Sequence, residues 1–461
     1  MKKRIVLGAV MLLALTALAL ACAGPTEPTT PTQPTTPPPA AEPGFESARL
    51  FTFPGNWGQV QSKKVTLFYP AQASWEFVTS PQHPGSSAVN TGTGCLACHQ
   101  GQEATLGQKL VSHATLEPDP IPGKKPTVDV DVKAAIDDQY LYMRFEYAAE
   151  RPGVTHSLWR YNGTEWKSWG GPKPETAPGV DNSYEDRIAL NIADSDIPAF
   201  DGAPIGFEKA GCFITCHNSM RAMPNEPTSA EVKAHPYFGD EGLKRTDIRK
   251  YLLISRTETD VTGGWDKTKS AEEIKTLLDE GQFLDLWQWR GARSGPIGYG
   301  DDSYVLEYRK FDPGKGIWSS PAQPEFMYDE SKTGFKAIPE SEFEQKLRDF
   351  PMVSGQNVVP LDPSAIFKEG DILSKYILQT PDGSRADLLF NSTWTDGKWV
   401  VEMRRALNTG NPEDKVFAAG KTYNIGIAIF HDMVSNRRHH VSFPLTLGID
   451  TAADIKAASI K

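Results

Sequence analysis

Two short cysteine–histidine motifs carry the clearest chemistry in this sequence. The first is Cys95-Leu-Ala-Cys98-His99, whose C-x-x-C-H spacing is typical of a c-type haem attachment site. Two thiols at this spacing reach the two vinyl groups of one porphyrin, and the histidine that follows reaches the iron. This motif, which we call the first box, therefore predicts a covalent haem with His99 as its proximal ligand.

The second box is Cys212-Phe-Ile-Thr-Cys216-His217, which has one more residue between its cysteines. We interpret it as a variant of the same attachment site, with His217 as the proximal ligand. A disulfide, common in exported proteins, would leave the following histidine unexplained. Structural zinc takes four ligands, of which a C-x-x-C-H motif offers three. We therefore expect two haem c groups, attached by Cys95, Cys98, Cys212 and Cys216.

The remaining cysteine, Cys22, lies at the end of a predicted signal peptide. A basic start at Lys2–Arg4 precedes an apolar run from Ile5 to Ala21, and small residues flank Cys22. This pattern predicts a lipoprotein signal peptide over residues 1–22, with a lipid-modified Cys22. The alternative is an uncleaved membrane-spanning helix, for which the run is short and lacks a charged stop. We expect an exported protein, anchored to a membrane by its lipid and facing the periplasm or the cell exterior.

After the signal peptide the chain divides into three parts. Residues 23–44 are rich in Pro and Thr and predict an extended tether. Residues 45–120 contain the first box, and residues 121–461 contain the second. The formal net charge of −10 argues against nucleic acid as a partner. It suits a protein that docks on basic patches of a redox partner.

The long C-terminal part has the sequence pattern of β-strands. Apolar and polar residues alternate in several short runs, which is typical of strands with one buried face. These runs are 128–132, 141–147, 188–192, 399–403 and 423–429. Because turns rich in Gly and Pro separate them, the sequence predicts a mainly β fold, an antiparallel β-sandwich with short helices and loop-rich haem segments. Ser270 with Glu273, and Ser341 with Glu344, predict two capped helix starts.

Three longer stretches resemble a known family. They are Leu67-Phe-Tyr-Pro-Ala-Gln-Ala-Ser-Trp-Glu-Phe77, the segment Asp285-Leu-Trp-Gln-Trp-Arg-Gly-Ala-Arg293 with Pro296-Ile-Gly-Tyr-Gly-Asp-Asp302, and Ile427-Ala-Ile-Phe-His-Asp432 with Arg438-His-His-Val-Ser-Phe443. Together they resemble the ethylbenzene dehydrogenase-related haem-binding family, also described as cytochrome c-552/DMSO reductase-like. The resemblance implies a β-sandwich haem domain that serves electron transfer, often beside a molybdenum enzyme.

The chain departs from part of that family. The resemblance implies a non-covalent b-type haem held by Met and Lys in the dehydrogenase subunits, whereas this chain has Cys212 and Cys216 and carries Arg290 where a Lys would be sought. It is therefore similar to a c-type, dihaem branch, and the b-type ligand pair does not transfer.

The distal iron ligands are less clear from sequence. For the first haem the candidates are His83 and His113, and the resemblance favours His83. The second haem has several candidates: Met220, Met223, His431, His439 and His440. A thioether from Met223 would raise the reduction potential, and His440 would arrive from a distant strand without wrapping the chain tightly. We predict that Met223 or His440 is the distal ligand of the second haem.

Trp287 and Arg290 form a further candidate pair. Trp287 and Trp289 alternate along a predicted strand, with Arg290 and Arg293 next to them. One interpretation is a core of tryptophans with solvated arginines. The other is that an arginine such as Arg290 pairs with a haem propionate while Trp287 packs on the porphyrin.

The sequence therefore predicts a lipid-anchored dihaem c-type cytochrome that transfers electrons without a catalytic residue of its own. Its expected partners are the membrane, through the anchor, and redox proteins such as a molybdopterin oxidoreductase or a quinol-oxidising membrane complex. Two alternatives remain: a dihaem redox enzyme of the peroxidase or reductase type, which needs an open iron site, and a haem-containing binding or sensing module.

Overall fold

The computed structural model describes residues 44–171, 184–218, 226–259, 263–431 and 439–460. The predictions for Cys22, Met220 and Met223 lie outside these residues. The described chain is mainly β, as the sequence predicts, with short helices between the strands. Within these ranges no helix combines the length and the apolar character that crossing a bilayer requires.

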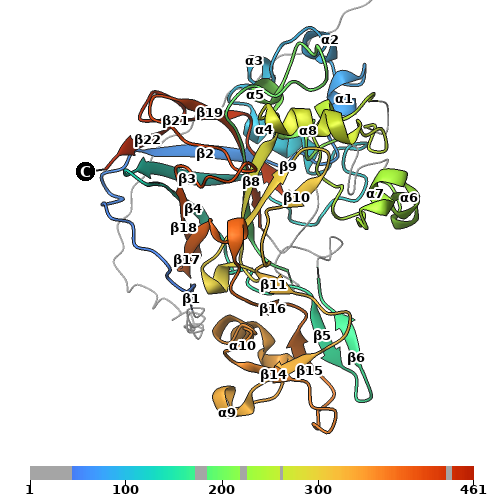
Figure 1. Cartoon of the computed structure of the whole chain (residues 1–461), viewed down its shortest axis with the longest axis vertical. Coiled ribbons are helices and arrows are strands. Elements are labelled where there is room, and N and C mark those ends of the chain that lie inside the picture. The colour runs from blue at the N-terminus through green and yellow to red at the C-terminus, as the bar shows by residue number, and fades with distance from the viewer. Residues whose placement is uncertain (1–43, 172–183, 219–225, 260–262, 432–438, 461) are drawn as a thin grey trace, which may run out of the picture. The chain divides into compact units, whose positions relative to one another are not determined.

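One large sheet dominates the structure. Its strands follow the order β1-β17-β18-β4-β3-β2-β20-β19-β7-β8-β9-β10 (Figure 1). Neighbours in this order pair antiparallel, whereas β22 pairs in parallel with both β21 and β3. The strands are β1 (Phe45–Glu46), β2 (Ser62–Phe68), β3 (Thr127–Ile136), β4 (Tyr140–Ala148), β7 (Arg187–Ala193), β8 (Leu284–Arg290), β9 (Asp301–Val305), β10 (Arg309–Phe311), β17 (Leu389–Thr395), β18 (Lys398–Ala406), β19 (Thr422–Phe430), β20 (His440–Val441), β21 (Leu445–Ile449) and β22 (Ile455–Ser459).

The predicted alternating runs form strands of this sheet. β3 and β4 make a hairpin whose turn is held by Asp137, because its Oδ1 accepts from the backbone N–H groups of Gln139 (2.8 Å) and Tyr140 (2.7 Å). β18 continues the sheet, with Val401 opposite Phe145. Alternation predicts these strands because successive side chains point to opposite faces of a sheet.

The sheet folds over itself, so that its inner faces pack into one core. Residues of β3, β4 and β18 share this core with residues of β7, β8 and β19. Trp289 from β8 meets Trp399 from β18 edge to face, with ring centres 4.7 Å apart. Such packing of two β layers is that of a sandwich.

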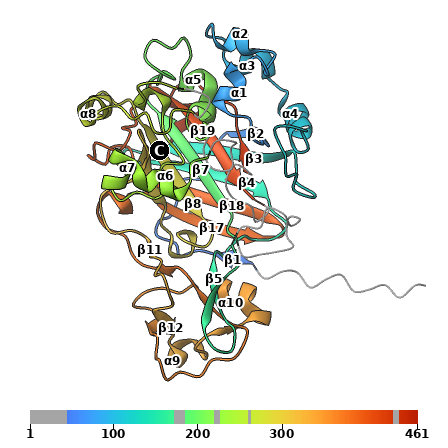
Figure 2. The same cartoon turned by 90° about the vertical axis from the view of Figure 1, so that its right-hand side faces the viewer.

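The outer face of β7, β8 and β19 is covered by helices and loops (Figure 2). In the described residues up to Ile297, the helices and 3-10 turns are α1 (Trp75–Thr79), α2 (Ser86–Val89), α3 (Cys95–His99), α4 (Glu103–Leu110), α5 (Phe207–Ala210), η1 (Gly211–Ile214), α6 (Ser229–Ala234), α7 (Pro236–Asp240), η2 (Leu253–Ser255), α8 (Ala271–Asp279) and η3 (Gly295–Ile297). Ser270 and Glu273 form the predicted capping box of α8. A second apolar core lies beneath these elements.

A smaller sheet with the order β13-β15-β5-β6 was not predicted. Its elements and their neighbours are β5 (Leu158–Tyr161), β6 (Trp166–Trp169), β11 (Trp318–Ser319), β12 (Phe326–Tyr328), α9 (Glu330–Thr333), β13 (Ile338–Pro339), η4 (Glu340–Glu342), α10 (Phe343–Asp349), β14 (Val358–Pro360), β15 (Asp371–Ser374), β16 (Ile377–Leu378) and η5 (Gly383–Ala386). The helix start predicted at Ser341 is wrong, because α10 begins at Phe343 after a 3-10 turn and has no side-chain cap. Figures 1 and 2 show this sheet and α1–α4 at opposite ends of the large sheet.

Candidate haem-binding sites

The first box is itself a short helix. α3 spans Cys95–His99, so its residues three and four apart lie on one side of the helix. Cys95, Cys98 and His99 border a cavity of about 920 Å³, a volume found in cofactor sites. Its walls are mostly apolar and include Phe68, Trp75, Phe77, Val89, Leu106, Leu110, Phe213 and Phe443. A large apolar cofactor would bury its faces here.

Two imidazole rings lie close together in this cavity. The ring centres of His83 and His99 are 6.1 Å apart. A metal that bonds one nitrogen of each ring at about 2 Å would hold the ring centres roughly 6 Å apart. His83 Nδ1 lies 3.0 Å from the backbone oxygen of Val78. If Nδ1–H donates there, Nε2 is left with the lone pair that a metal ligand needs.

The other predicted ligand, His113, uses its ring differently. Its Nδ1 accepts from the backbone N–H groups of Thr115 (3.2 Å) and Leu116 (3.1 Å). A neutral imidazole that accepts at Nδ1 carries its proton on Nε2. In this form Nδ1 uses its lone pair in hydrogen bonds and Nε2 carries the proton, so neither nitrogen is ready to bind iron. His113 nevertheless borders the cavity. Burial lowers the pKa of His83, which favours the neutral, metal-binding form of that ring.

The second box is a tight turn above the outer face of the sheet. The backbone N–H groups of Cys216 and His217 both donate to the Cys212 oxygen, at 2.9 and 3.2 Å. This turn accommodates the extra residue of the box. Asn191 on β7 directs its Nδ2 toward both sulfurs, 3.7 Å from Cys212 Sγ and 3.9 Å from Cys216 Sγ. A Cβ at Gly426 on β19 would lie 3.0 Å from Cys212 Sγ, so a side chain at this position would press on the sulfur.

A cavity of about 290 Å³ lies beside the second box. Its floor contains small residues of the sheet, Ala189, Gly426 and Ala428. The cationic side chains around it are Arg187, Arg249, Lys250, Arg290, Arg293 and Arg309. Among the described residues that line it there is no Asp or Glu. The cavity therefore favours an anionic ligand, and guanidinium groups suit carboxylates in particular.

The buried carboxylate of Glu185 holds two arginines of this cationic wall. Glu185 Oε1 accepts from Arg187 Nε (2.9 Å) and from Arg293 Nη2 (2.7 Å). Its Oε2 accepts from the backbone N–H groups of Ala292 and Arg293, at 3.1 and 3.0 Å. Burial opposes ionisation, but Arg293, Arg187 and Arg290 outweigh it and hold the pKa of Glu185 below its ordinary value. Glu185 therefore holds Arg187 and Arg293 in place, whereas Arg290 donates from Nε to Asp301 Oδ2 at 2.8 Å.

The second box also has a second imidazole close to its own histidine. The ring centres of His217 and His439 are 5.6 Å apart. His439 lines the cavity and stacks on Phe430 at 4.4 Å, and His217 is fully buried beside Phe213. From the sequence, His439 is one of five candidates, and Met223 and His440 are the predicted ligands.

The other predicted partners of the second box lie elsewhere. His440 turns away from the cavity, and its Nε2 lies 2.8 Å from the backbone oxygen of Lys125. His431 lies beside Asp186, with its Nδ1 3.8 Å from Asp186 Oδ1. Of the candidate histidines, the structure brings His439 to the box. Met223 is outside the described residues.

Alternation along β8 separates the predicted Trp–Arg pair. Arg290 lines the second cavity, together with Leu286 and Gln288. Trp287 points to the opposite face and packs in the inner core against Phe417, with ring centres 5.6 Å apart. The structure therefore brings Arg290 to the cavity and leaves Trp287 in the core.

The alternatives for the cysteines find no support in the geometry. Cys95, Cys98, Cys212 and Cys216 form no disulfide. Burial raises the pKa of the Cys95 thiol to about 11 and that of Cys212 to about 12, so neither is a reactive thiolate. Within the described ranges, the clustered donors suited to a metal ion are Asp285, Asp302 and Asp414, with no cysteine among them.

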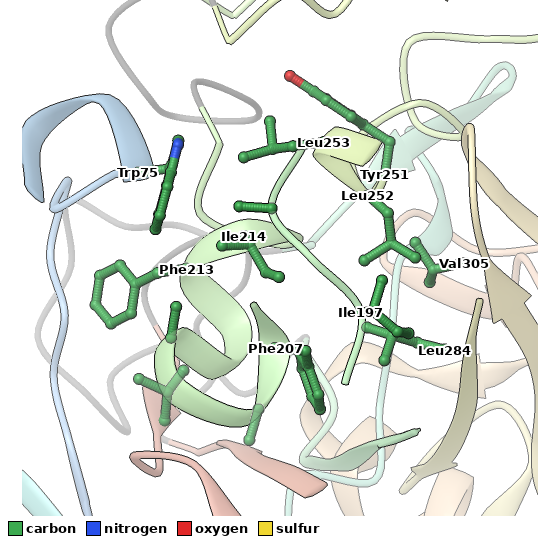
Figure 3. Close-up of a cluster of buried hydrophobic side chains, with 14 of the residues drawn as sticks. Trp75, Ile197, Phe207, Phe213, Ile214, Tyr251, Leu252, Leu253, Leu284 and Val305 are labelled. Carbon is green, nitrogen blue, oxygen red and sulfur yellow. The ribbon is translucent and has the colours of Figure 1, made fainter. Parts of the chain in front are cut away.

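The two cavities meet at the second box. Phe213 belongs to that box and lines the first cavity, while its ring lies 5.1 Å from the ring of His217. Figure 3 shows Phe213 on the side of Trp75, whereas Ile214 lies toward Leu253. The backbone N–H of Trp75, another residue of the first cavity, donates to the His217 oxygen at 2.8 Å. The sites are thus linked by direct contacts.

Comparison with known proteins gives the chain its relatives. It is 25% identical over 407 residues to cytochrome c-552 of Stutzerimonas stutzeri, covering 88% of this chain and 91% of that one. It is 26% identical over 171 residues to cytochrome c-551 of Rhodocyclus tenuis, covering 37% of this chain and 58% of the other. The ethylbenzene dehydrogenase family model matches residues 55–442. Because that match covers most of the sequence, including both boxes, the chain belongs to the ethylbenzene dehydrogenase family.

Proposed function

We propose that this protein is a dihaem c-type cytochrome that carries electrons between redox partners. One observation carries the proposal: the histidine of each cysteine box lies close to a second imidazole, with ring centres 6.1 Å apart in one case and 5.6 Å in the other. Haem c supplies reversible one-electron chemistry at its iron. The relatives named as cytochromes support the same class of protein.

At the first site, Cys95 and Cys98 would attach the haem, and His99 and His83 would bind the iron. Gln102 Oε1 lies 3.4 Å from His99 Nδ1, and the Val78 oxygen holds His83 in the same way. Such outer contacts orient the ligand nitrogens toward the metal. The apolar wall would bury much of the porphyrin surface.

At the second site, Cys212 and Cys216 would attach the haem, and His217 and His439 would bind the iron. His439 replaces His440 in this proposal because it lines the cavity. Arg290 and its neighbouring arginines would hold the propionates, since the wall lacks a carboxylate among its described residues.

Two bound histidines per iron would leave no open coordination site, which favours a carrier over an enzyme. Phe213 touches both sites, and short contacts between them favour electron exchange within the chain.

The location and partners follow from the N-terminus and the charge. We propose that the protein is exported, that Cys22 anchors it to a membrane, and that a molybdopterin oxidoreductase or a quinol-oxidising membrane complex exchanges electrons with it. A Cys22→Ala variant should then leave the membrane fraction, because a lipid chain is what holds it there. Retention of that variant after salt washing would favour an uncleaved helix.

Spectroscopy of the intact protein tests the carrier function. We expect the mass of the mature chain to include two haems, and both to be low-spin in the oxidised form and unreactive toward carbon monoxide when reduced. A Cys212→Ala/Cys216→Ala variant should keep one haem and serves as the control. A single haem in the native protein would reject the dihaem proposal, and rapid carbon monoxide binding would favour an enzyme with a displaceable ligand.

A further inference from the structure

A buried group of aspartates lies at the edge of the sandwich core, outside the linings of both haem cavities. Asp285 is on β8, Asp302 is on β9, Asp312 follows β10, and Asp414 precedes Lys415. Their exposed fractions are 0%, 0%, 3% and 6%. Oxygens of Asp285, Asp302 and Asp414 all lie within 4.8 Å of one another. Carboxylates from distant parts of the chain thus converge on one point.

The cations nearby do not balance these carboxylates. Arg405 is fully buried, with Nη1 3.3 Å from Asp285 Oδ2 and Nη2 2.5 Å from Asp414 Oδ1. Lys415 donates its backbone N–H to Asp285, but its Nζ bonds Asp194 (2.8 Å) and the Gly281 oxygen (2.6 Å) instead. One guanidinium therefore serves the whole group.

Several carboxylate oxygens in the group have no hydrogen-bond donor. Both oxygens of Asp302, both of Asp312 and Oδ1 of Asp285 are buried and accept no hydrogen bond within the described part of the chain. Buried polar groups are nearly always paired, and an unpaired buried charge is costly. Asp302 is the most informative residue of the group. Its side chain is wholly buried, neither of its carboxylate oxygens accepts a hydrogen bond from the described residues, and it points at the other two carboxylates.

We propose that Asp285, Asp302 and Asp414, with Asp312 close by, bind a divalent cation, and that this cation is Ca²⁺. The donors are all oxygen, which suits hard cations rather than zinc or copper. Ca²⁺ takes oxygen ligands at about 2.4 Å, so oxygens within 4.8 Å of one another can surround one ion. Mg²⁺ fits less well because it usually keeps several waters, for which a buried site has little room.

The ion would have a structural role. It would join the paired strands β8 and β9 to the segment before Lys415, which lies far from both in the sequence. β8 also carries Arg290 into the second haem cavity, so the site would stiffen one wall of that cavity. The proposal does not depend on the haem, since none of its residues lines either cavity.

Metal analysis and calorimetry of the purified holoprotein test the site. We expect one Ca²⁺ per chain, lost on prolonged EGTA treatment and restored by CaCl₂ titration. The melting temperature should fall after EGTA and rise again with CaCl₂, because a ligand that binds the folded state stabilises it. MgCl₂ at the same ionic strength should restore much less. Absence of Ca²⁺, with a melting temperature indifferent to both EGTA and CaCl₂, overturns the proposal.

A matched pair of variants separates cation binding from proton binding. Asp302→Asn should weaken Ca²⁺ binding at least about tenfold, as loss of a metal-site group does. The control is Asp138→Asn, which changes an exposed aspartate in the β3–β4 turn and should bind Ca²⁺ as the native protein does. Unchanged Ca²⁺ affinity in Asp302→Asn overturns the assignment. If that variant does not fold, the stoichiometry and EGTA response of the native protein still decide.

Discussion

Glu185 offers a quantitative test of how the second site is built. Replacing it with Gln removes a buried negative charge while keeping the shape of the side chain. Both oxygens of Glu185 accept from N–H donors of Arg187, Ala292 and Arg293. In either orientation of the new Gln amide, its NH₂ group would face N–H donors that now bond Glu185. Arg187 and Arg293 would also lose their buried counter-charge.

The expected loss follows from burial. Breaking a buried ion pair by removing one partner costs about 3–5 kcal/mol, because the other charge is left uncompensated. Glu344 provides the control, since it pairs with Arg151 at 2.7 Å, the same distance as Arg293 to Glu185, but its side chain is 37% exposed. Exposed pairs are worth about 0–1 kcal/mol. Glu185→Gln should therefore destabilise the protein far more than Glu344→Gln.

Denaturant unfolding of the holoprotein at several pH values measures this difference. Because the pKa of Glu185 is lowered in the folded protein, its stabilisation is present above the ordinary carboxyl pKa of 4.5 and is lost as the pH falls through the folded value. The difference in unfolding free energy between the native protein and Glu185→Gln should therefore be largest at pH 7 and shrink below pH 4.5. Equal losses for Glu185→Gln and Glu344→Gln at pH 7, or a gap that grows in acid, would refute the reasoning.

The remaining predictions concern the ligands and the floor of the second site. His83→Ala should make the first haem high-spin and raise its reduction potential, since an imidazole ligand supports the ferric state. His113→Ala should leave the first haem low-spin. Electron paramagnetic resonance measures the spin states, and the reverse result would make His113 the ligand. His439→Ala should make the second haem high-spin, while His440→Ala should not, and a low-spin second haem in His439→Ala rejects that ligand. Gly426→Val should displace Cys212 and lower the covalent haem content, which intact mass measures, because a Cβ there lies 3.0 Å from Cys212 Sγ; full haem content would contradict this.

Several features of the protein could be read from the sequence because they depend on near neighbours along the chain. The spacing of Cys95, Cys98 and His99 sets what one porphyrin can reach, whatever the rest of the fold. Alternation in 128–132 and 423–429 predicted strands, because side chains on a strand alternate between its faces. Ser270 and Glu273 predicted a helix start, since a capping box is closed within one turn.

Tertiary structure decided which distant residues meet these motifs. His439 and His440 are adjacent in the sequence, yet they face opposite sides, and only the pairing of β20 with β19 determines which one reaches the second box. The same alternation on β8 sends Arg290 to the cavity and Trp287 to the core. No pattern in the sequence predicts a role for Glu185 or the four buried aspartates, because isolated acidic residues become informative only when folding buries them together. Their role depends on distance and burial, which spacing along the chain does not record.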